Sequence, residues 1–310
     1  MGKVAFVFPG QGSQLPGMGQ ALMDLGSARE AFAEMDAALD APVSALCLSG
    51  SAVDLALTEN TQTAILAVSV AAWRGLAERG IRPDYVAGHS LGEYSALVAT
   101  GALSAADAVR TVRRRGRYMQ EAVPVGEGAM AALLGLEREG VEELCRQQRR
   151  EGEVLAAANY NSPGQVVIAG NRAAVERALA AASAAGARRS ILLPVSAPFH
   201  CALMEPAARR LAVDLAALHL GPLAIPLVAN VDALETTSPE SAREALVRQV
   251  TAPVLWEDSV LRLAALGVET FVEVGPGKVL CGLVKRIVKS ARLLAVSTPG
   301  EVEQAVEALA

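Results

Sequence analysis

Apolar and polar positions change along the chain in blocks, and these blocks predict an α/β fold. Short apolar runs of strand length, such as residues 1–8 and 85–87, alternate with longer stretches in which apolar residues recur at helical spacing. Residues 64–73 form one such apolar stretch, of the kind found in a protein core. Alternation of strands and helices is typical of a largely parallel sheet covered by helices. We therefore expect an α/β protein with a largely parallel sheet.

One stretch, residues 128–195, follows a different order. Its pattern predicts, in turn, a strand, a helix, two strands, a helix and a strand: residues 128–136, 137–150, 154–161, 165–169, 172–185 and 190–195. The order β-α-β-β-α-β is that of a ferredoxin-like unit. We expect residues 128–195 to form a small domain inserted into a large domain made of residues 1–127 and 196–310. One continuous sheet is the alternative.

The composition is that of a well-packed globular protein without a general attraction for polyanions. Of 310 residues, 52% are hydrophobic and 20% are charged, which favours a large core over disorder. The formal net charge of −5 gives no general affinity for nucleic acid or an anionic membrane. The mean hydropathy is +0.32, but no apolar run approaches the roughly 20 residues that span a bilayer. No signal peptide is expected either.

The cysteines indicate a reducing compartment. Four of them lie far apart in the sequence and form no C-x-x-C or C-x-x-H pattern: Cys47, Cys145, Cys201 and Cys281. They are interpreted as free thiols of a cytoplasmic protein. No metal site and no cofactor are expected.

Residues 88–92 are Gly-His-Ser-Leu-Gly, between a short apolar run and a helical stretch. A G-x-S-x-G sequence is meaningful in this context, because a tight strand-to-helix turn accepts only small residues at its corners. Such a turn holds the Ser90 hydroxyl at the N-terminus of the following helix, where partial positive charge favours a developing oxyanion. The pattern also occurs in ordinary turns, so Ser90 is a candidate nucleophile that needs partners.

A serine hydroxyl needs a base within hydrogen-bond reach, and the chain has three histidines. His89 adjoins the serine, but neighbours in a tight turn point in different directions, so a local contact is expected for it. His219 has no polar companions and is expected at the surface. His200 lies in a polar loop after the last strand of the inserted unit, where catalytic groups are commonly placed. His200 is therefore the candidate base.

No acid stands at an obvious strand end between Ser90 and His200, where hydrolases of this topology place one. A backbone carbonyl could hold the imidazole tautomer instead, which would leave a dyad. The glycine-rich loop at residues 9–14 does not match a phosphate-binding pattern. A loop in this position could present a backbone N–H to an oxyanion.

The helix that begins after Ser104 carries an arginine on its apolar face. Asp107 completes a start that resembles a capping box, and Ala108, Val112 and Met119 share the face on which Arg115 lies. An arginine that faces a core must meet an anion, because burial of an unpaired charge is costly. Two readings remain: a structural pair with a buried carboxylate, or a bidentate clamp for a substrate carboxylate.

Together these motifs resemble the malonyl-CoA:acyl carrier protein transacylase family, and the resemblance covers nearly the whole chain. Several separate motifs in the correct order are far more specific than G-x-S-x-G alone. They are Phe8-Pro9-Gly10-Gln11-Gly12-Ser13-Gln14, Gly88-His89-Ser90-Leu91-Gly92-Glu93-Tyr94, Arg115-Gly116, Asn159-Tyr160-Asn161-Ser162-Pro163-Gly164-Gln165, Phe199-His200, Arg248-Gln249 and Glu273-Val274-Gly275-Pro276-Gly277. The fold that the resemblance implies is a large α/β-hydrolase-like domain with the inserted ferredoxin-like unit.

The resemblance implies a role for each matching residue. Ser90 attacks the malonyl thioester with His200 as general base, and Arg115 binds the malonyl carboxylate. The remaining roles belong to the backbone N–H groups of Gln11 and Leu91 (oxyanion), the backbone carbonyl of Gln249 (orientation of His200), Asn161 (groove between the domains) and Phe199. A phenylalanine before the histidine is similar to the acyltransferases that take malonyl and exclude methylmalonyl groups.

The implied partners are malonyl-CoA and acyl carrier protein, in fatty-acid synthesis, with the enzyme as a monomer. Carrier proteins are acidic, so docking requires a local basic patch. Two sets of residues are expected to contribute: Arg110, Arg113, Arg114 and Arg117 on one helix face, and Lys278, Lys285, Arg286 and Lys289 near the C-terminus. The alternatives are a polyketide-pathway acyltransferase, a serine esterase or thioesterase, and a carrier-binding module without catalysis.

Overall fold

Two β-sheets organise the protein, which is described here by a computed structural model of residues 2–195 and 197–309. Five of the six strands of the larger sheet are parallel to one another, and the sixth, at one edge, pairs antiparallel with its neighbour. Its order is β11 (Arg292–Val296), β10 (Val268–Val274), β1 (Lys3–Phe8), β2 (Tyr85–Gly88), β7 (Leu227–Val228) and β8 (Glu235–Thr236). The expected α/β class with a largely parallel sheet is confirmed.

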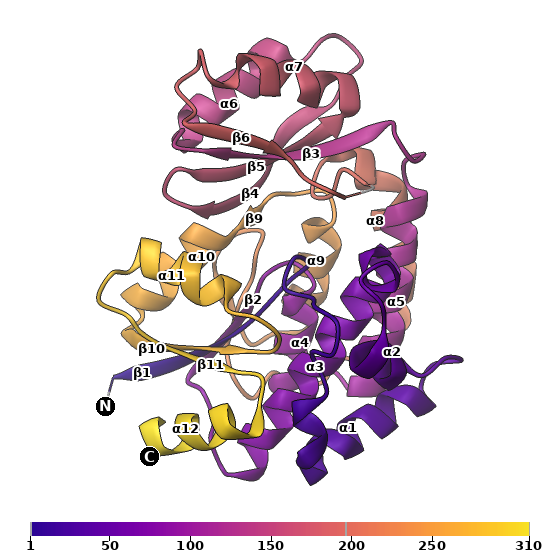
Figure 1. The fold of residues 1–310 in the computed structure, drawn as a ribbon, viewed down its shortest axis with the longest axis vertical. Coiled ribbons are helices and arrows are strands. Elements are labelled where there is room, and N and C mark those ends of the chain that lie inside the picture. Colours follow the sequence, from indigo (N-terminus) through magenta and orange to yellow (C-terminus); the bar gives the residue numbers. More distant parts are fainter. Residues whose placement is uncertain (1, 196, 310) are drawn as a thin grey trace.

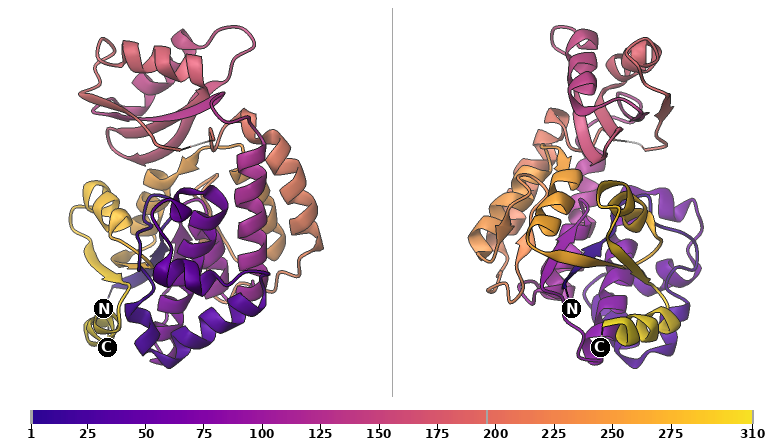
Figure 2. Two further views of the ribbon diagram at one scale, coloured as in Figure 1. Left: turned by 45° about the vertical axis from the view of Figure 1, so that its right-hand side comes forward. Right: turned by 90° about the vertical axis from the view of Figure 1, so that its left-hand side faces the viewer.

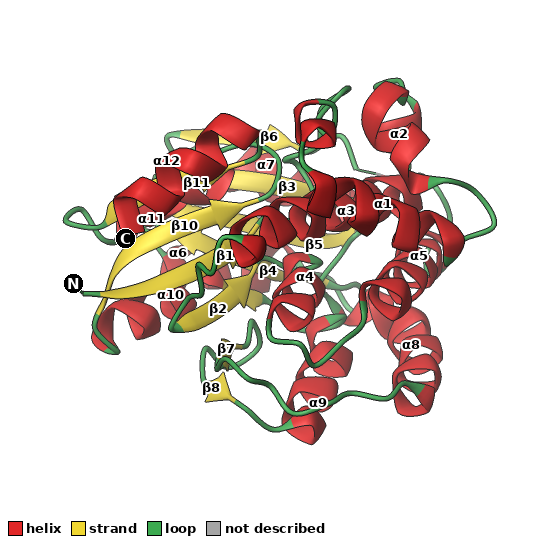
Figure 3. Cartoon of the chain, turned by 90° about the horizontal axis from the view of Figure 1, so that it is seen from below, coloured by secondary structure: helices red, strands yellow, loops and turns green. Residues whose placement is uncertain are grey.

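Helices cover both faces of the larger sheet, as a parallel sheet requires. Side chains of β1 alternate, so that Phe6 and Phe8 join the core beneath α3 while Ala5 and Val7 pack with α10 and α11. The helices that surround this sheet are α1 (Gly26–Ala37), α2 (Val43–Ser49), α3 (Thr58–Glu78), α4 (Gly92–Ala99), α5 (Ala105–Glu121), α8 (Glu205–Ala217), α9 (Pro239–Gln249), α10 (Trp256–Ala265), α11 (Val279–Ile287) and α12 (Pro299–Leu309). Figure 3 shows the sheet between these layers.

The smaller sheet stands above the larger one, with α6 and α7 on its outer face (Figure 1). It is antiparallel through its first four strands. Its order is β6 (Arg189–Leu192), β3 (Gly128–Leu134), β5 (Gln165–Asn171), β4 (Leu155–Ser162) and β9 (Val254–Leu255), and its helices are α6 (Arg138–Gln148) and α7 (Arg172–Ala182). The β-α-β-β-α-β order predicted for this stretch is present, and the described residues form two sheets rather than one continuous sheet.

The structure also differs from the sequence prediction of this unit. The strand predicted at 128–136 ends at Leu134, because Gly135 turns the chain with φ 84°. A fifth strand, β9, joins the sheet in parallel with β4 and comes from a distant part of the chain. The predicted boundary at residue 196, like the two terminal residues 1 and 310, lies outside the described residues.

Two features of the helices agree with the sequence. The Ser104 side chain caps α5 by accepting a hydrogen bond from the Asp107 N–H at 3.0 Å, as the sequence predicts. Within the described residues no helix is both long enough and apolar enough to cross a membrane.

The two ends of the chain lie near one another, away from the smaller sheet (Figure 2).

Candidate active site

The sharp turn after β2 places Ser90 at the carboxyl end of the larger sheet. A Cβ atom on Gly88 would lie 1.9 Å from the carbonyl carbon of Gly92, and one on Gly92 would lie 2.1 Å from the Phe8 carbonyl oxygen. Both corners of the turn therefore require glycine. Ser90 has φ 54°, a left-handed conformation that costs free energy for a residue with a side chain. The surrounding backbone contacts maintain this strain, and Ser90 remains partly exposed.

Replacement of Gly88 by alanine is expected to lower the free energy of unfolding by about 3 kcal/mol, because the new methyl group meets backbone that cannot move aside. Gly282→Ala is the matched control: the added Cβ meets nothing within 4 Å, and alanine in a helix is favoured by about 0.5–1 kcal/mol. Urea denaturation measures both variants. Equal stability of Gly88→Ala and the unsubstituted protein would contradict the close approach.

Ser90 and His200 are in direct contact, although they lie 110 positions apart in the sequence. The Ser90 Oγ lies 2.8 Å from Nε2 of His200, and the His200 Nδ1 lies 2.8 Å from the backbone carbonyl oxygen of Gln249. A carbonyl oxygen only accepts, so Nδ1 carries the proton and Nε2 is left as the acceptor that faces the serine. The side chain of His200 is buried. This arrangement can deprotonate the Ser90 hydroxyl without an acidic third residue.

Burial, followed by the charge of Arg115, lowers the pKa of His200 from 6.5 to about 3. His200 is therefore neutral, and competent as a base, throughout the physiological range. The unfolded chain would bind a proton at this histidine near pH 6.5, whereas the folded chain does so only near pH 3. The free energy of unfolding therefore decreases as the pH falls from 6.5 toward 3.

The reaction of Ser90 with a neutral sulfonyl fluoride is expected to have a rate that is flat from about pH 8 to about pH 5, because the base stays unprotonated. Intact mass spectrometry at timed intervals measures this rate. A fall in rate centred near the ordinary histidine value of 6.5 would show that His200 titrates freely and would contradict the assignment.

Arg115, on α5, brings a buried positive charge to the serine. Its side chain is 1% exposed, and Nη2 donates to Ser90 Oγ at 3.0 Å and to Gln249 Oε1 at 2.9 Å. Nη1 donates to Gln62 Oε1 at 2.6 Å. All three partners are neutral, and no carboxylate of the described residues forms an ion pair with this guanidinium. Of the two readings left open by the sequence, the structural pair with a buried carboxylate is absent from the described part of the chain.

Two backbone N–H groups lie at the elbow without a protein acceptor in the part of the chain that the structure describes. They belong to Gln11, in the loop after β1, and to Leu91, which directly follows the serine. The loop is pressed against the elbow, since a Cβ on Gly10 would lie 2.5 Å from the His89 carbonyl oxygen. Free donors beside a nucleophile are suited to an oxyanion.

The remaining candidate residues surround this centre. Asn161, on β4, is hydrogen-bonded through Oδ1 to Nε2 of His89 at 2.8 Å, so His89 has a partner 72 positions away rather than the local contact expected from the sequence. Phe199 is buried beside His200. His219 is exposed, as predicted.

Sequence reasoning assigned no role to three polar residues of the site: Gln62, Asn230, and Glu93, which it had only quoted within a motif. Asn230 is buried, accepts from the Ser90 N–H at 2.7 Å through Oδ1 and donates to the Gly88 carbonyl oxygen at 2.6 Å through Nδ2. It lies two positions after the end of β7, and a polar residue near the carboxyl end of a parallel strand was the available signal.

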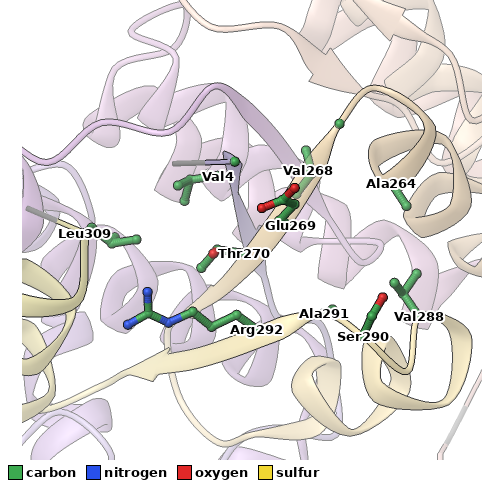
Figure 4. A pocket seen from close by; sticks show the side chains of 12 residues that line it. Val4, Ala264, Val268, Glu269, Thr270, Val288, Ser290, Ala291, Arg292 and Leu309 are labelled. Atoms are coloured by element: carbon green, nitrogen blue, oxygen red, sulfur yellow. The ribbon is translucent and has the colours of Figure 1, made fainter.

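A cavity of about 610 Å³ lies elsewhere, between β10, β11 and the C-terminal helix (Figure 4). Val4, Glu269, Thr270 and Arg292 are among its lining residues, whereas Ser90, His200 and Arg115 are not. Gly267 and Val268 lie at the amino end of β10. The cavity is therefore at the end of the sheet opposite to Ser90. Open α/β sheets bind ligands at the carboxyl ends of their strands, so this cavity is not part of the candidate site.

Comparisons with known proteins find relatives over nearly the whole chain. Residues 5–307 match the acyl transferase domain family. The chain is 47% identical over 310 residues to the malonyl CoA-acyl carrier protein transacylase of Bacillus subtilis, covering 100% of this chain and 98% of the relative. It is 51% identical over 312 residues to the protein of the same description from Escherichia coli K12, covering 99% and 100%.

Solved structures with the same fold include two with related descriptions. An acyl carrier protein S-malonyltransferase from Vibrio cholerae is 47% identical with a TM-score of 0.95, covering 98% of this chain and 99% of that one. A malonyl-transacylase in complex with its type II PKS acyl-carrier protein is 46% identical with a TM-score of 0.96, covering 99% of both chains.

Proposed function

The chain belongs to the acyl transferase family, among its malonyl CoA-acyl carrier protein transacylases, and from this premise we propose how its residues carry out malonyl transfer. One observation supports the proposal above all: the Ser90 Oγ lies 2.8 Å from the His200 base and 3.0 Å from the Arg115 guanidinium. A nucleophile, its base and an unneutralised cation thus meet at one atom. The cation suits a substrate that carries a carboxylate beside its thioester.

In the first half-reaction, Arg115 binds the malonyl carboxylate and Ser90 Oγ attacks the thioester carbonyl carbon. His200 takes the serine proton as the C–O bond forms. The N–H groups of Gln11 and Leu91 donate to the oxyanion of the tetrahedral intermediate. The C–S bond then breaks and His200 gives its proton to the CoA sulfur. CoA leaves as the free thiol, and malonyl-Ser90 remains.

In the second half-reaction, the phosphopantetheine thiol of the carrier attacks malonyl-Ser90. His200 accepts the thiol proton and returns it to Ser90 Oγ as the ester bond breaks. Because His200 is held by the Gln249 backbone carbonyl throughout, the same base serves both directions. The products are malonyl-carrier and the free enzyme, so the cycle is ping-pong and requires no cofactor.

Two further residues shape the acyl site in this proposal. Phe199 is buried immediately before His200, where its ring would leave no room for a branch at the α-carbon of the acyl group. Asn161 is proposed to line a groove between the domains, and its hydrogen bond to His89 holds the residue before the nucleophile. The first assignment rests on the position of Phe199 next to His200, the second on the contact of Asn161 with His89.

The test is to incubate the protein with malonyl-CoA, record its intact mass, and then add phosphopantetheinylated carrier. A malonyl adduct that requires Ser90 and Arg115 and then moves to the carrier supports the transfer. An adduct lost to water with the carrier unmodified would indicate a thioesterase or esterase. No adduct would overturn Ser90 as the nucleophile and favour a carrier-binding module. Parallel trials with fatty-acid and polyketide carriers decide between the two pathways, of which we propose fatty-acid synthesis.

The two basic sets differ in how far acids neutralise them. On α5, three of the four arginines face carboxylates: Arg110 pairs with Asp107, Arg114 with Asp214 and Arg117 with Glu59. In the C-terminal set, Lys278 pairs with Glu301. Lys285 donates to the Lys289 carbonyl oxygen, and Arg286 to the Gln165 amide oxygen. The charge on α11 is therefore the better candidate for docking an acidic carrier.

Charge reversal by Lys285→Glu with Arg286→Glu is expected to raise the apparent KM for the carrier about tenfold, because attraction becomes repulsion at the docking surface. Acylation by malonyl-CoA should not change. The matched control reverses Arg114 and Arg117 on α5 and should affect the carrier less. An unchanged carrier KM in the α11 variant would contradict docking at this helix.

We also propose the domain division, the oligomeric state and the compartment. Residues 129–187 contribute a separate hydrophobic cluster between the smaller sheet, α6 and α7, which supports 128–195 as an inserted domain within 1–127 and 196–310. The four cysteines are free, which suits a cytoplasmic protein. A monomer is expected, and sedimentation equilibrium tests it.

A further inference from the structure

We infer that Glu93 is a positioning residue for malonyl transfer: its carboxylate sets the orientation of the Gln249 side-chain amide, which in turn presents Arg115 to the acyl carboxylate. The inference rests on the proposed function. It concerns a residue that touches neither Ser90 Oγ nor the guanidinium.

Glu93 is a buried carboxylate without a cation beside it. It lies in the first turn of α4, is fully buried, and forms no ion pair with any described residue. Its Oε2 accepts hydrogen bonds at 3.0 Å from the Asn230 N–H and from Gln249 Nε2. Burial raises the pKa of Glu93 to about 7, and these two hydrogen bonds act in the opposite direction. At pH 8 the carboxylate is ionised. Its two hydrogen-bond partners, Asn230 and Gln249, both contact Ser90.

The neighbours of the Gln249 amide fix which way it faces. Nε2 donates to Glu93 Oε2 and to the Ser90 carbonyl oxygen, both at 3.0 Å. Oε1 accepts from Arg115 Nη2 at 2.9 Å. A reversed amide would set NH₂ against the guanidinium and oxygen against a carboxylate, which places donor against donor and acceptor against acceptor. The charge of Glu93 is the strongest single determinant of this orientation.

The amide also separates two opposite charges that would otherwise pair. With Gln249 between them, the Arg115 guanidinium contacts an amide oxygen rather than the Glu93 carboxylate. Its charge is therefore stabilised but not neutralised, and it remains available to an anion. A direct Arg115–Glu93 ion pair would compete with the substrate carboxylate.

The test compares Glu93→Gln, Gln249→Leu and the double variant at pH 8. The Gln249→Leu change removes the amide but keeps the backbone carbonyl that orients His200. Each single variant is expected to raise the malonyl-CoA concentration for half-maximal acylation about tenfold, the value of one hydrogen bond to a charged group. The double variant should be no worse than Gln249→Leu, because both changes break one relay. In each variant the reaction of Ser90 with a neutral sulfonyl fluoride should fall less than acylation by malonyl-CoA, since that probe has no carboxylate for Arg115 to bind.

The sign of the effect separates positioning from simple electrostatics. Loss of the Glu93 charge alone would strengthen the attraction of Arg115 for an anion, so a lower or unchanged half-saturating concentration overturns the inference. Equal losses with malonyl-CoA and the sulfonyl fluoride would also overturn it, because they indicate general damage. If Glu93→Gln does not fold, Glu93→Asp takes its place, and its retained charge should give a smaller rise in the same direction.

The matched control is Glu273→Gln. Glu273 is equally buried and accepts from two backbone N–H groups, of Leu280 at 3.1 Å and Cys281 at 2.8 Å, but it belongs to no contact of the Ser90 site. Neither acylation by malonyl-CoA nor the reaction with the sulfonyl fluoride should change in this variant. If the unsubstituted protein reacts with the sulfonyl fluoride but forms no malonyl adduct, the proposed function itself fails.

Discussion

Replacement of Arg115 by alanine is expected to lower the rate of Ser90 acylation by malonyl-CoA about a thousandfold. The guanidinium is 1% exposed, so the substrate carboxylate it binds would lose its partner in a site from which water is largely excluded. Truncation of one member of a buried charge pair costs about 2–5 kcal/mol, and about 1.4 kcal/mol corresponds to a factor of ten. Single-turnover acylation followed by intact mass measures the loss.

The selectivity of the variant is more informative than its rate. Acetyl-CoA has no carboxylate, so Arg115→Ala should reduce acetyl transfer far less, and the preference for malonyl over acetyl groups should collapse. Arg115→Lys keeps the charge but not the planar fork, and is expected to fall between the two. Arg115→Met fills the same space without charge and should match alanine in selectivity while it preserves the fold. A variant that loses both substrates equally would show that Arg115 only supports the structure.

Much of the fold could be predicted because its elements are set by local patterns. Residues close together in the sequence determine the apolar runs of β1 and β2, the Ser104 cap of α5 and the β-α-β-β-α-β order. The fifth strand of the smaller sheet could not be predicted in this way. β9 has two residues, Val254 and Leu255, and it is a strand only because β4 lies beside it. Pairing over such a distance has no local signal.

The candidate site divides along the same line. Ser90, His200 and Arg115 stand out because each breaks a local rule: a strained turn, a polar loop, and a charge on an apolar face. Glu93 breaks no local rule, and Asn230 is marked only by its polarity after a two-residue strand; the importance of both comes from contacts across more than 130 positions. Long-range polar networks are specified by the folded geometry, and a pattern along one chain does not contain that geometry.

Ser90→Ala is expected to abolish acyl-enzyme formation, because alanine has no oxygen to acylate, and His200→Ala is expected to reduce it about 10⁵-fold or more. The reason is that the hydroxyl and the imidazole act as one unit, joined at 2.8 Å, so that loss of either partner removes the function of both. Because both positions already hold side chains at positive φ, 54° and 58°, alanine adds no new backbone strain. Single-turnover acylation measures the rates, and His219→Ala, at the exposed histidine, is the control that should not change them. A His200→Ala rate within about tenfold of that of the unsubstituted protein would show that the imidazole is not the base, and would contradict the dyad.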